Sequence, residues 1–167
     1  MMTTEPNLYI SIDDNRWNSH RFALKKLSAI AIDAAWNAIK KSNAPPIFVS
    51  ISFTNNRTIK KINKQTRGFD KPTNILSFQN FESVSDLPKL SKNMPAVPVG
   101  DLIIAYEMIF AEAMAENKKP KDHLTHLLVH GFLHLFGYNH MNENDAQKME
   151  GLEIKILKTL GISNPYL

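Results

Sequence analysis

The most constraining feature of this sequence is a set of histidines inside an apolar segment near its C-terminal end. His130 and His134 lie four residues apart, so on a helix both imidazoles project from the same face. Gly137 can end such a helix in the left-handed conformation that glycine tolerates, which would turn His140 back toward the same point. Three imidazoles leave one tetrahedral position open, as in a catalytic zinc site. The sequence therefore predicts one Zn²⁺ ion per chain, held by these three histidines.

The same segment limits the chemistry that such an ion could perform. Its spacing matches the long zinc motif of the metzincin proteases, His-Glu-x-x-His-x-x-Gly-x-x-His, but Gly131 stands where that motif has its general-base glutamate. Glycine cannot accept a proton, so peptide hydrolysis by the glutamate-assisted route is disfavoured. A zinc ion held by neutral imidazoles can still lower the pKa of its water from about 15.7 to about 7. It can also stabilise negative charge that develops on a phosphodiester oxygen.

The remaining histidines are expected to have other roles. His126 cannot share an ion with both His130 and His134, because positions eight apart on a helix are separated by about 12 Å along its axis. A place in the core or behind a ligand is expected for it. His20 and His123 are expected to be ordinary core histidines.

Composition places the chain among globular proteins and excludes some sites. Its 167 residues are expected to form one domain, 1–167, and the absence of cysteine excludes disulfides and thiolate ligands. No apolar run is long enough to span a membrane, and the N-terminal residues do not resemble a signal peptide. A cytoplasmic location is therefore expected.

Positive charge is concentrated in one short stretch. The net charge of the whole chain is only +4, and the stretch has six basic residues and one acidic residue, Asp70. The basic residues are Arg57, Lys60, Lys61, Lys64, Arg67 and Lys71. Such a face suits a polyanionic substrate, and the alternative is a solvated helix face without a partner.

Hydrophobic periodicity predicts an α+β fold. Strands are expected at 8–12, 47–53, 73–78 and 99–105, and residues 79–98 are expected to form an aperiodic loop. Helices are expected at 19–41, after Thr54 or Asn55, at 106–117, at 121–136, and from Asn142 or Asn144 to about 160. The segment 121–136 is apolar nearly all round. The expected architecture is a four-stranded sheet with helices packed around a buried central histidine-bearing helix that supplies a zincin-like metal site.

Three motifs in order resemble the YbeY family of bacterial single-domain endoribonucleases. The first is His-Gly-Phe-Leu-His-Leu-Phe-Gly-Tyr-Asn-His at 130–140. The second is Arg67 followed by Asp-Lys-Pro-Thr-Asn-Ile-Leu-Ser-Phe at 70–78, and the third is Gly-Asp-Leu at 100–102. One departure is Asn139, which stands where the family usually has aspartate. Asp101 is expected to open a strand, with a contact to a ligating histidine as the alternative.

The resemblance implies a set of roles for residues of this chain. His130, His134 and His140 would hold zinc, with His130 at the catalytic centre. Arg67 would be the catalytically important arginine that binds the phosphate, and Lys64 and Lys71 would be further substrate contacts. The family acts on single-stranded RNA, with maturation of the 3′ end of the small-subunit (16S-type) ribosomal RNA and ribosome quality control as its usual roles. The small ribosomal subunit or its assembly factors would then be partners.

Two other functions stay open from the sequence. The chain could be a different zinc hydrolase whose base comes from elsewhere, or a non-catalytic RNA-binding assembly factor with a structural zinc. Neither the nucleophile, water or the RNA 2′-hydroxyl, nor the oligomeric state follows from the sequence.

Overall fold

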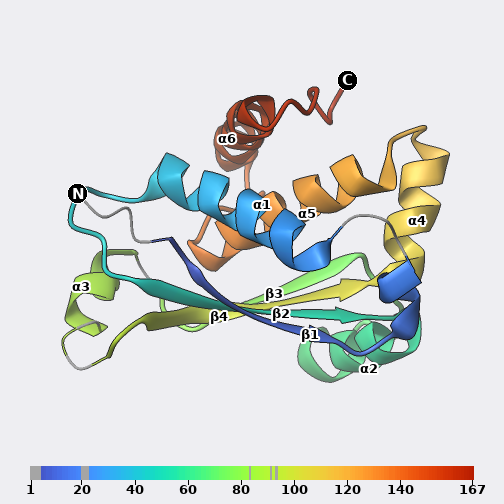
Figure 1. Cartoon of the computed structure of the whole chain (residues 1–167), viewed down its shortest axis with the longest axis horizontal. Helices are drawn as coiled ribbons and strands as arrows, with labels where there is room; N and C mark the ends of the chain where they lie inside the picture. Colours follow the sequence, from blue (N-terminus) through green and yellow to red (C-terminus); the bar gives the residue numbers. More distant parts are fainter. Residues whose placement is uncertain (1–4, 20–22, 83, 91, 93) are drawn as a thin grey trace.

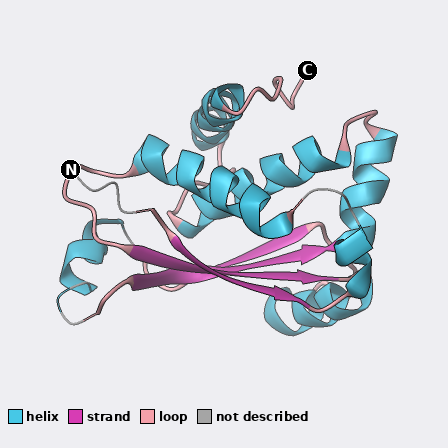
Figure 2. Cartoon of the chain, viewed as in Figure 1, coloured by secondary structure: helices cyan, strands magenta, loops and turns pink. Residues whose placement is uncertain are grey.

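The computed structural model describes residues 5–19, 23–82, 84–90, 92 and 94–167. Its strands are β1 (Asn7–Ile12), β2 (Ile47–Thr54), β3 (Ile75–Gln79) and β4 (Val97–Ala105). Its α-helices are α1 (Leu24–Ile39), α2 (Asn56–Arg67), α3 (Leu87–Leu90), α4 (Tyr106–Ala115), α5 (Pro120–Leu135) and α6 (Glu143–Thr159). The 3-10 helices η1 (Asn15–Ser19) and η2 (Val84–Asp86) precede α1 and α3. Over these residues the chain has the expected α+β content (Figure 2).

The four strands form one mixed sheet in the order β1-β2-β4-β3. β1 pairs in parallel with β2, and β2 pairs in parallel with β4. β3 runs antiparallel to β4 and forms an edge of the sheet. Parallel neighbours need a crossover connection, which α1 supplies between β1 and β2.

Helices cover both faces of this sheet (Figure 1). α1 and α5 lie on one face with α6 outside them, and α2 lies on the opposite face. α5 is therefore enclosed between the sheet and α6, and most of its side chains are buried. The all-round apolar pattern of 121–136 correctly predicted a buried central helix that carries the histidines. None of the described helices combines the length and apolar character needed to span a membrane.

α5 approaches the sheet closely because two glycines leave room for it. A Cβ atom added at Gly131 would lie 2.6 Å from Cδ1 of Ile75 and 3.1 Å from Cδ2 of Leu102. Gly100 has a φ of 153°, and a Cβ atom there would lie 2.3 Å from the carbonyl oxygen of Phe78 and 2.8 Å from Cδ2 of Leu135. The position that holds a glutamate in metzincins therefore faces the sheet in this chain and has no space for a side chain.

The aperiodic loop expected at 79–98 is wrong in part. This stretch contains η2 and α3, and β4 begins at Val97 instead of residue 99. Phe81 and Leu87 are buried, and the ring of Phe81 contacts that of Phe136, with centroids 5.5 Å apart. Helices of one turn give no periodic signal, so only their tertiary contacts reveal them.

The start expected for the first long helix, residue 19, is also wrong. Ser19 belongs to η1, residue 23 is not helical, and α1 begins at Leu24. Trp17 explains this interruption, because its indole is buried and its Nε1 donates a hydrogen bond of 2.9 Å to the carbonyl of Thr54. Residues 20–22, which include His20, lie outside the described residues.

Candidate metal centre

The end of α5 positions the three histidines predicted from their spacing. His130 and His134 lie on the last two turns of α5, which ends at Leu135. Gly137 has a φ of 85°, as expected for the residue that turns the chain. The amide of Gly137 donates to the carbonyl of His134 at 3.1 Å, and the amide of Tyr138 donates to that of Leu133 at 3.2 Å. This turn brings the following residues back beside the helix.

His140 thereby joins the two helical histidines. One ligand nitrogen from each of His130, His134 and His140 lies within 4.8 Å of the others. The Nε2 atoms of His130 and His134 are 2.9 Å apart, and the ring of His140 lies 5.3 Å from that of His130 between centroids. His130 and His134 are partly buried, whereas His140 is exposed. The structure therefore brings together all three residues of the predicted ligand set.

Hydrogen bonds at the Nδ1 atoms of His130 and His134 set the tautomers of these two rings. Nδ1 of His130 lies 2.6 Å from Oε1 of Glu153, and Nδ1 of His134 lies 2.7 Å from the carbonyl oxygen of Tyr138. A carboxylate and a carbonyl can only accept, so each Nδ1 carries the proton that it donates. In the neutral imidazoles each Nε2 then presents a lone pair, as a metal ligand requires.

These facing lone pairs make the site fit a cation. Two lone pairs 2.9 Å apart repel unless a positive charge lies between them. Two nitrogens bound to one tetrahedral zinc ion at about 2.05 Å would be about 3.3 Å apart, so a small outward movement of the rings would admit the ion. The donor set is three imidazoles without thiolate, which suits zinc and related transition metals.

Electrostatics favour neutral histidine beside a charged carboxylate. Burial, and after it the proximity of the His130 ring, lowers the pKa of His134 to about 4, so the His134 ring is neutral at pH 7. Burial alone would raise the pKa of Glu153, but the nearby imidazole of His126 and the hydrogen bonds from His130 and Tyr166 lower it to about 2. Glu153 is therefore an anion with no exposed surface, in contact with a candidate metal ligand.

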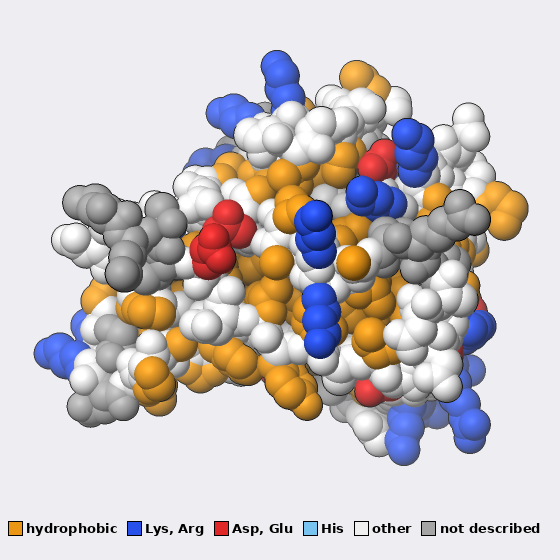
Figure 3. All heavy atoms as spheres, in the orientation of Figure 1, with side chains coloured by type: hydrophobic (Ala, Val, Ile, Leu, Met, Phe, Trp, Pro, Cys, Tyr) orange, Lys and Arg blue, Asp and Glu red, His pale blue; other side chains and the backbone are white. Residues whose placement is uncertain are grey.

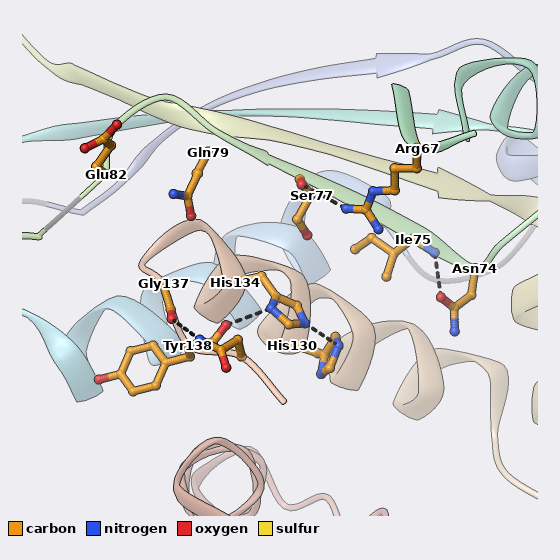
Figure 4. A pocket seen from close by; sticks show the side chains of 11 residues that line it. Arg67, Asn74, Ile75, Ser77, Gln79, Glu82, His130, His134, Gly137 and Tyr138 are labelled. Carbon is orange, nitrogen blue, oxygen red and sulfur yellow. Dashed lines mark hydrogen bonds between the residues drawn. The ribbon is translucent and has the colours of Figure 1, made fainter. Parts of the chain in front are cut away.

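A cavity of about 600 Å³ opens in front of these rings. Its lining includes His130 and His134 from α5, Arg67 from the end of α2, and Ser77 from β3. Figure 4 shows Arg67 on the sheet side of the cavity and the two histidines on the α5 side. Nη2 of Arg67 donates a long hydrogen bond of 3.4 Å to the carbonyl of Ser77. The predicted arginine and two of the three predicted ligands therefore share one cavity.

The lysines predicted to contact substrate lie outside this lining. Nζ of Lys64 is 3.0 Å from Oδ2 of Asp70, and Nζ of Lys71 lies 5.9 Å from the centroid of the Phe69 ring. Both side chains are exposed, and Figure 3 shows Lys and Arg side chains gathered over α2. A contact between these lysines and RNA stays a prediction.

The carboxylate that contacts the candidate ligand His130 belongs to Glu153, not to Asp101, which the sequence had suggested. Asp101 lies inside β4, where its neighbours Gly100 and Leu102 face α5, so its own side chain points to the opposite face. Asp101 therefore does not open the strand, which begins at Val97, and the expected alternative, a contact between Asp101 and a ligating histidine, is wrong as well. Glu153 fills that place from α6, and the signal for it was a glutamate on the apolar face that carries Met149 and Ile156.

The other two histidines of α5 lie behind the ligands. Nε2 of His126 is 3.3 Å from Oε1 of Glu153, which agrees with the expected role behind a ligand. His123 is buried, as expected, with its Nε2 2.8 Å from Oε2 of Glu112. Neither belongs to the three-histidine group.

Asn139 shapes the turn that carries His140. Its Nδ2 donates to the carbonyl of Gly137 at 3.2 Å, and its Oδ1 accepts from the amide of Met141 at 2.9 Å. An aspartate could accept the second bond but could not donate the first. The asparagine therefore bonds to the backbone on both sides of itself in the turn, and unlike an aspartate it places no negative charge beside the candidate ligands.

Comparison with known proteins identifies the family. The family model Endoribonuclease YbeY matches residues 10–161. The protein named Endoribonuclease YbeY of Sinorhizobium fredii is 45% identical over 169 residues, with 98% of this chain and 93% of its own covered. Its namesake of Agrobacterium fabrum is 41% identical over 165 residues, with 96% and 94% covered. A solution structure from Thermotoga maritima, 20% identical, matches the fold with a TM-score of 0.58 over 90% of this chain and 87% of that one. This chain belongs to the YbeY family of endoribonucleases.

Proposed function

We propose that this chain is a metal-dependent endoribonuclease in which His130, His134 and His140 hold one Zn²⁺ ion and Arg67 binds the phosphate that is cleaved. Family membership supports an RNA endonuclease role. The observation that carries the finer proposal is the cavity that Arg67 shares with two of the histidines. A zincin-like arrangement of the ion is part of this proposal.

Some residues of the site orient the metal ligands, and Arg67 stabilises negative charge on the phosphate. Glu153 and the Tyr138 carbonyl hold two imidazoles with Nε2 directed at the ion's position. The planar guanidinium of Arg67 pairs two oxygens of the phosphate and stabilises the charge that builds there. When bound, the ion supplies a concentrated positive charge that lowers the pKa of the nucleophile, either water or the RNA 2′-hydroxyl.

The proposed substrate is single-stranded RNA. An unpaired strand can present one phosphate to a cavity of this size without the bulk of a second strand. The basic residues of α2, which include Lys64, lie on the element that ends at Arg67 and would hold the neighbouring phosphates with Lys71. The proposed role is maturation of the 3′ end of the small-subunit ribosomal RNA and ribosome quality control, by one domain, 1–167, in the cytoplasm.

Cleavage of an end-labelled single-stranded RNA tests this proposal. The parent, His134→Ala and Arg67→Ala are purified identically and assayed with and without a chelator, with zinc content measured in each. We expect both variants to lose cleavage and the chelator to abolish it in the parent. Only His134→Ala should lose zinc, because Arg67 is not a ligand.

The outcomes separate this proposal from its alternatives. Equal residual cleavage in all three proteins would indicate a contaminant and a non-catalytic RNA-binding factor. Full activity of Arg67→Ala would remove the proposed role of that residue. Hydrolysis of an unfolded protein that depends on His134 would indicate a different hydrolase, although the packing of Gly131 against Ile75 and Leu102 leaves no space for the glutamate of a metzincin.

A further inference from the structure

The last residues of the chain fold back behind the metal centre. After α6, the amide of Ile162 donates to the carbonyl of Leu157 at 3.0 Å, and Ile162 packs against the core. Nζ of Lys118 donates to the carbonyl of Pro165 at 2.8 Å, which fastens the segment to the turn between α4 and α5. These contacts hold the C-terminal segment, residues 160–167, in one place against α5.

Tyr166 is the residue of this segment that contacts Glu153, although 43% of its surface stays exposed. Its hydroxyl donates a short hydrogen bond to Oε2 of Glu153. Its ring meets that of His126 edge to face, with centroids 5.6 Å apart and planes at 84°. The phenol therefore contacts one residue of α5 and one of α6, beside the carboxylate that contacts His130.

The two oxygens of Glu153 are held by two different segments. Oε1 accepts from Nδ1 of His130 at 2.6 Å, and Oε2 accepts from Tyr166. Rotation about the last side-chain bond moves both oxygens, so the bond from Tyr166 adds a second restraint on the carboxylate plane to the one that His130 supplies. Glu153 is completely buried in this arrangement, so its carboxylate depends on protein groups for its hydrogen bonds.

We infer that Tyr166 is a positioning residue of the metal centre: it fixes the carboxylate plane of Glu153, which in turn holds His130 with Nε2 aimed at the ion. This inference rests on the proposed metal site. The family model matches residues 10–161, so the contact comes from a part of the chain beyond the matched region. The C-terminal segment thus contributes to the metal centre although none of its residues lines the cavity.

Zinc affinity of the full chain without RNA tests this inference. Zn²⁺ is titrated against a chromogenic chelator for the parent, Tyr166→Phe and the matched control Tyr9→Phe, which removes the same hydroxyl from an exposed tyrosine of β1. Loss of an outer partner of a metal ligand weakens metal binding about 10- to 100-fold. We expect Tyr166→Phe to weaken zinc binding by about tenfold, near the lower end of this range, and Tyr9→Phe to bind zinc as tightly as the parent.

A double-mutant cycle shows whether Tyr166 acts through Glu153. Glu153→Gln removes the negative charge and should weaken zinc binding by about 10- to 100-fold on its own. In the Glu153→Gln background, Tyr166→Phe should then reduce zinc affinity by less than it does in the parent, because Tyr166 acts on the metal site through Glu153. Lys118→Met, which removes the bonds of its ammonium group to the Pro165 carbonyl and to Glu116, should weaken zinc binding in the same direction by less.

Thermal unfolding of the zinc-free forms separates positioning from simple packing. If Tyr166→Phe lowers the melting temperature of the zinc-free protein but binds zinc as tightly as the parent, the positioning role is overturned. Independent effects of Tyr166→Phe and Glu153→Gln would also overturn it. If the parent binds no zinc, the proposed function fails first and this inference fails with it.

Discussion

Replacement of Gly100 by alanine tests how tightly α5 is packed onto the sheet. Gly100 lies in β4 with a φ of 153°, a conformation that residues with a Cβ rarely adopt. The added methyl group would lie 2.3 Å from the carbonyl oxygen of Phe78 and 2.8 Å from Cδ2 of Leu135. The first contact is with backbone fixed by the pairing of β3 and β4, so it cannot be relieved by a side-chain rotation.

The expected loss of stability follows from these two effects. A residue held in an unfavourable backbone conformation costs about 1–3 kcal/mol. An extra methyl group in a packed core costs about 1–3 kcal/mol more. We therefore expect Gly100→Ala to lower the free energy of unfolding by about 2–6 kcal/mol, a large part of the roughly 5–15 kcal/mol of a typical domain. Because Leu135 follows His134 directly, zinc affinity should fall as well.

Urea unfolding followed by circular dichroism measures the effect, with Gly151→Ala as the matched control. Gly151 lies inside α6, and a Cβ atom there would meet nothing within 4 Å. The same substitution should therefore stabilise the protein at that position by about 0.5–1 kcal/mol. A loss below about 1 kcal/mol at Gly100 would refute the argument from close packing.

Three further predictions concern metal, acid and a helix cap. A zinc concentration of 100 times Kd should raise the stability of the parent by about 2.7 kcal/mol in calorimetry, and His140→Ala should lose most of this gain. Burial raises the pKa of Glu107, but hydrogen bonds from Arg16 and the backbone bring it below its usual value of 4.5. The ionised Glu107 therefore adds to the free energy of unfolding above about pH 4.5, and this contribution is lost as the pH falls further. Arg16→Ala should make the free energy of unfolding depend less on pH in this range, as measured by acid titration. Asn142→Ala should cost about 1 kcal/mol in urea unfolding, because Oδ1 of Asn142 accepts from the amide of Asp145 at the start of α6, and zinc content should not change.

The candidate ligands could be predicted because their arrangement depends on local geometry. The helical period places His130 and His134 together, and a glycine at a helix end turns the chain whatever surrounds it. The same local rules predicted Thr54 or Asn55, and Asn142 or Asn144, at the starts of two helices. Asn55 and Asn142 are the caps, and each accepts a hydrogen bond from the first turn of its helix. These features require no knowledge of the tertiary structure.

Features that depend on packing between distant elements could not be predicted. Glu153 contacts His130 only because α6 lies against α5, and the two residues are 23 positions apart. The position of Arg67 in the cavity depends on how α2 ends beside β3, and its sequence pattern alone also fitted a solvated side chain. Helix α3 is too short to show a period, so its burial through Leu87 appears only in the folded chain.

The division of the three histidines between a buried helix and an exposed turn has a kinetic consequence. Amide groups of a core helix such as α5 exchange with solvent mainly when the whole domain opens, whereas those of a surface turn exchange through small local motions. His130 and His134 therefore keep their relative positions as long as the protein is folded, whereas His140 can move away from them without unfolding of the domain. A metal ion would enter and leave on the side of His140, with the helical pair as its first and last contact.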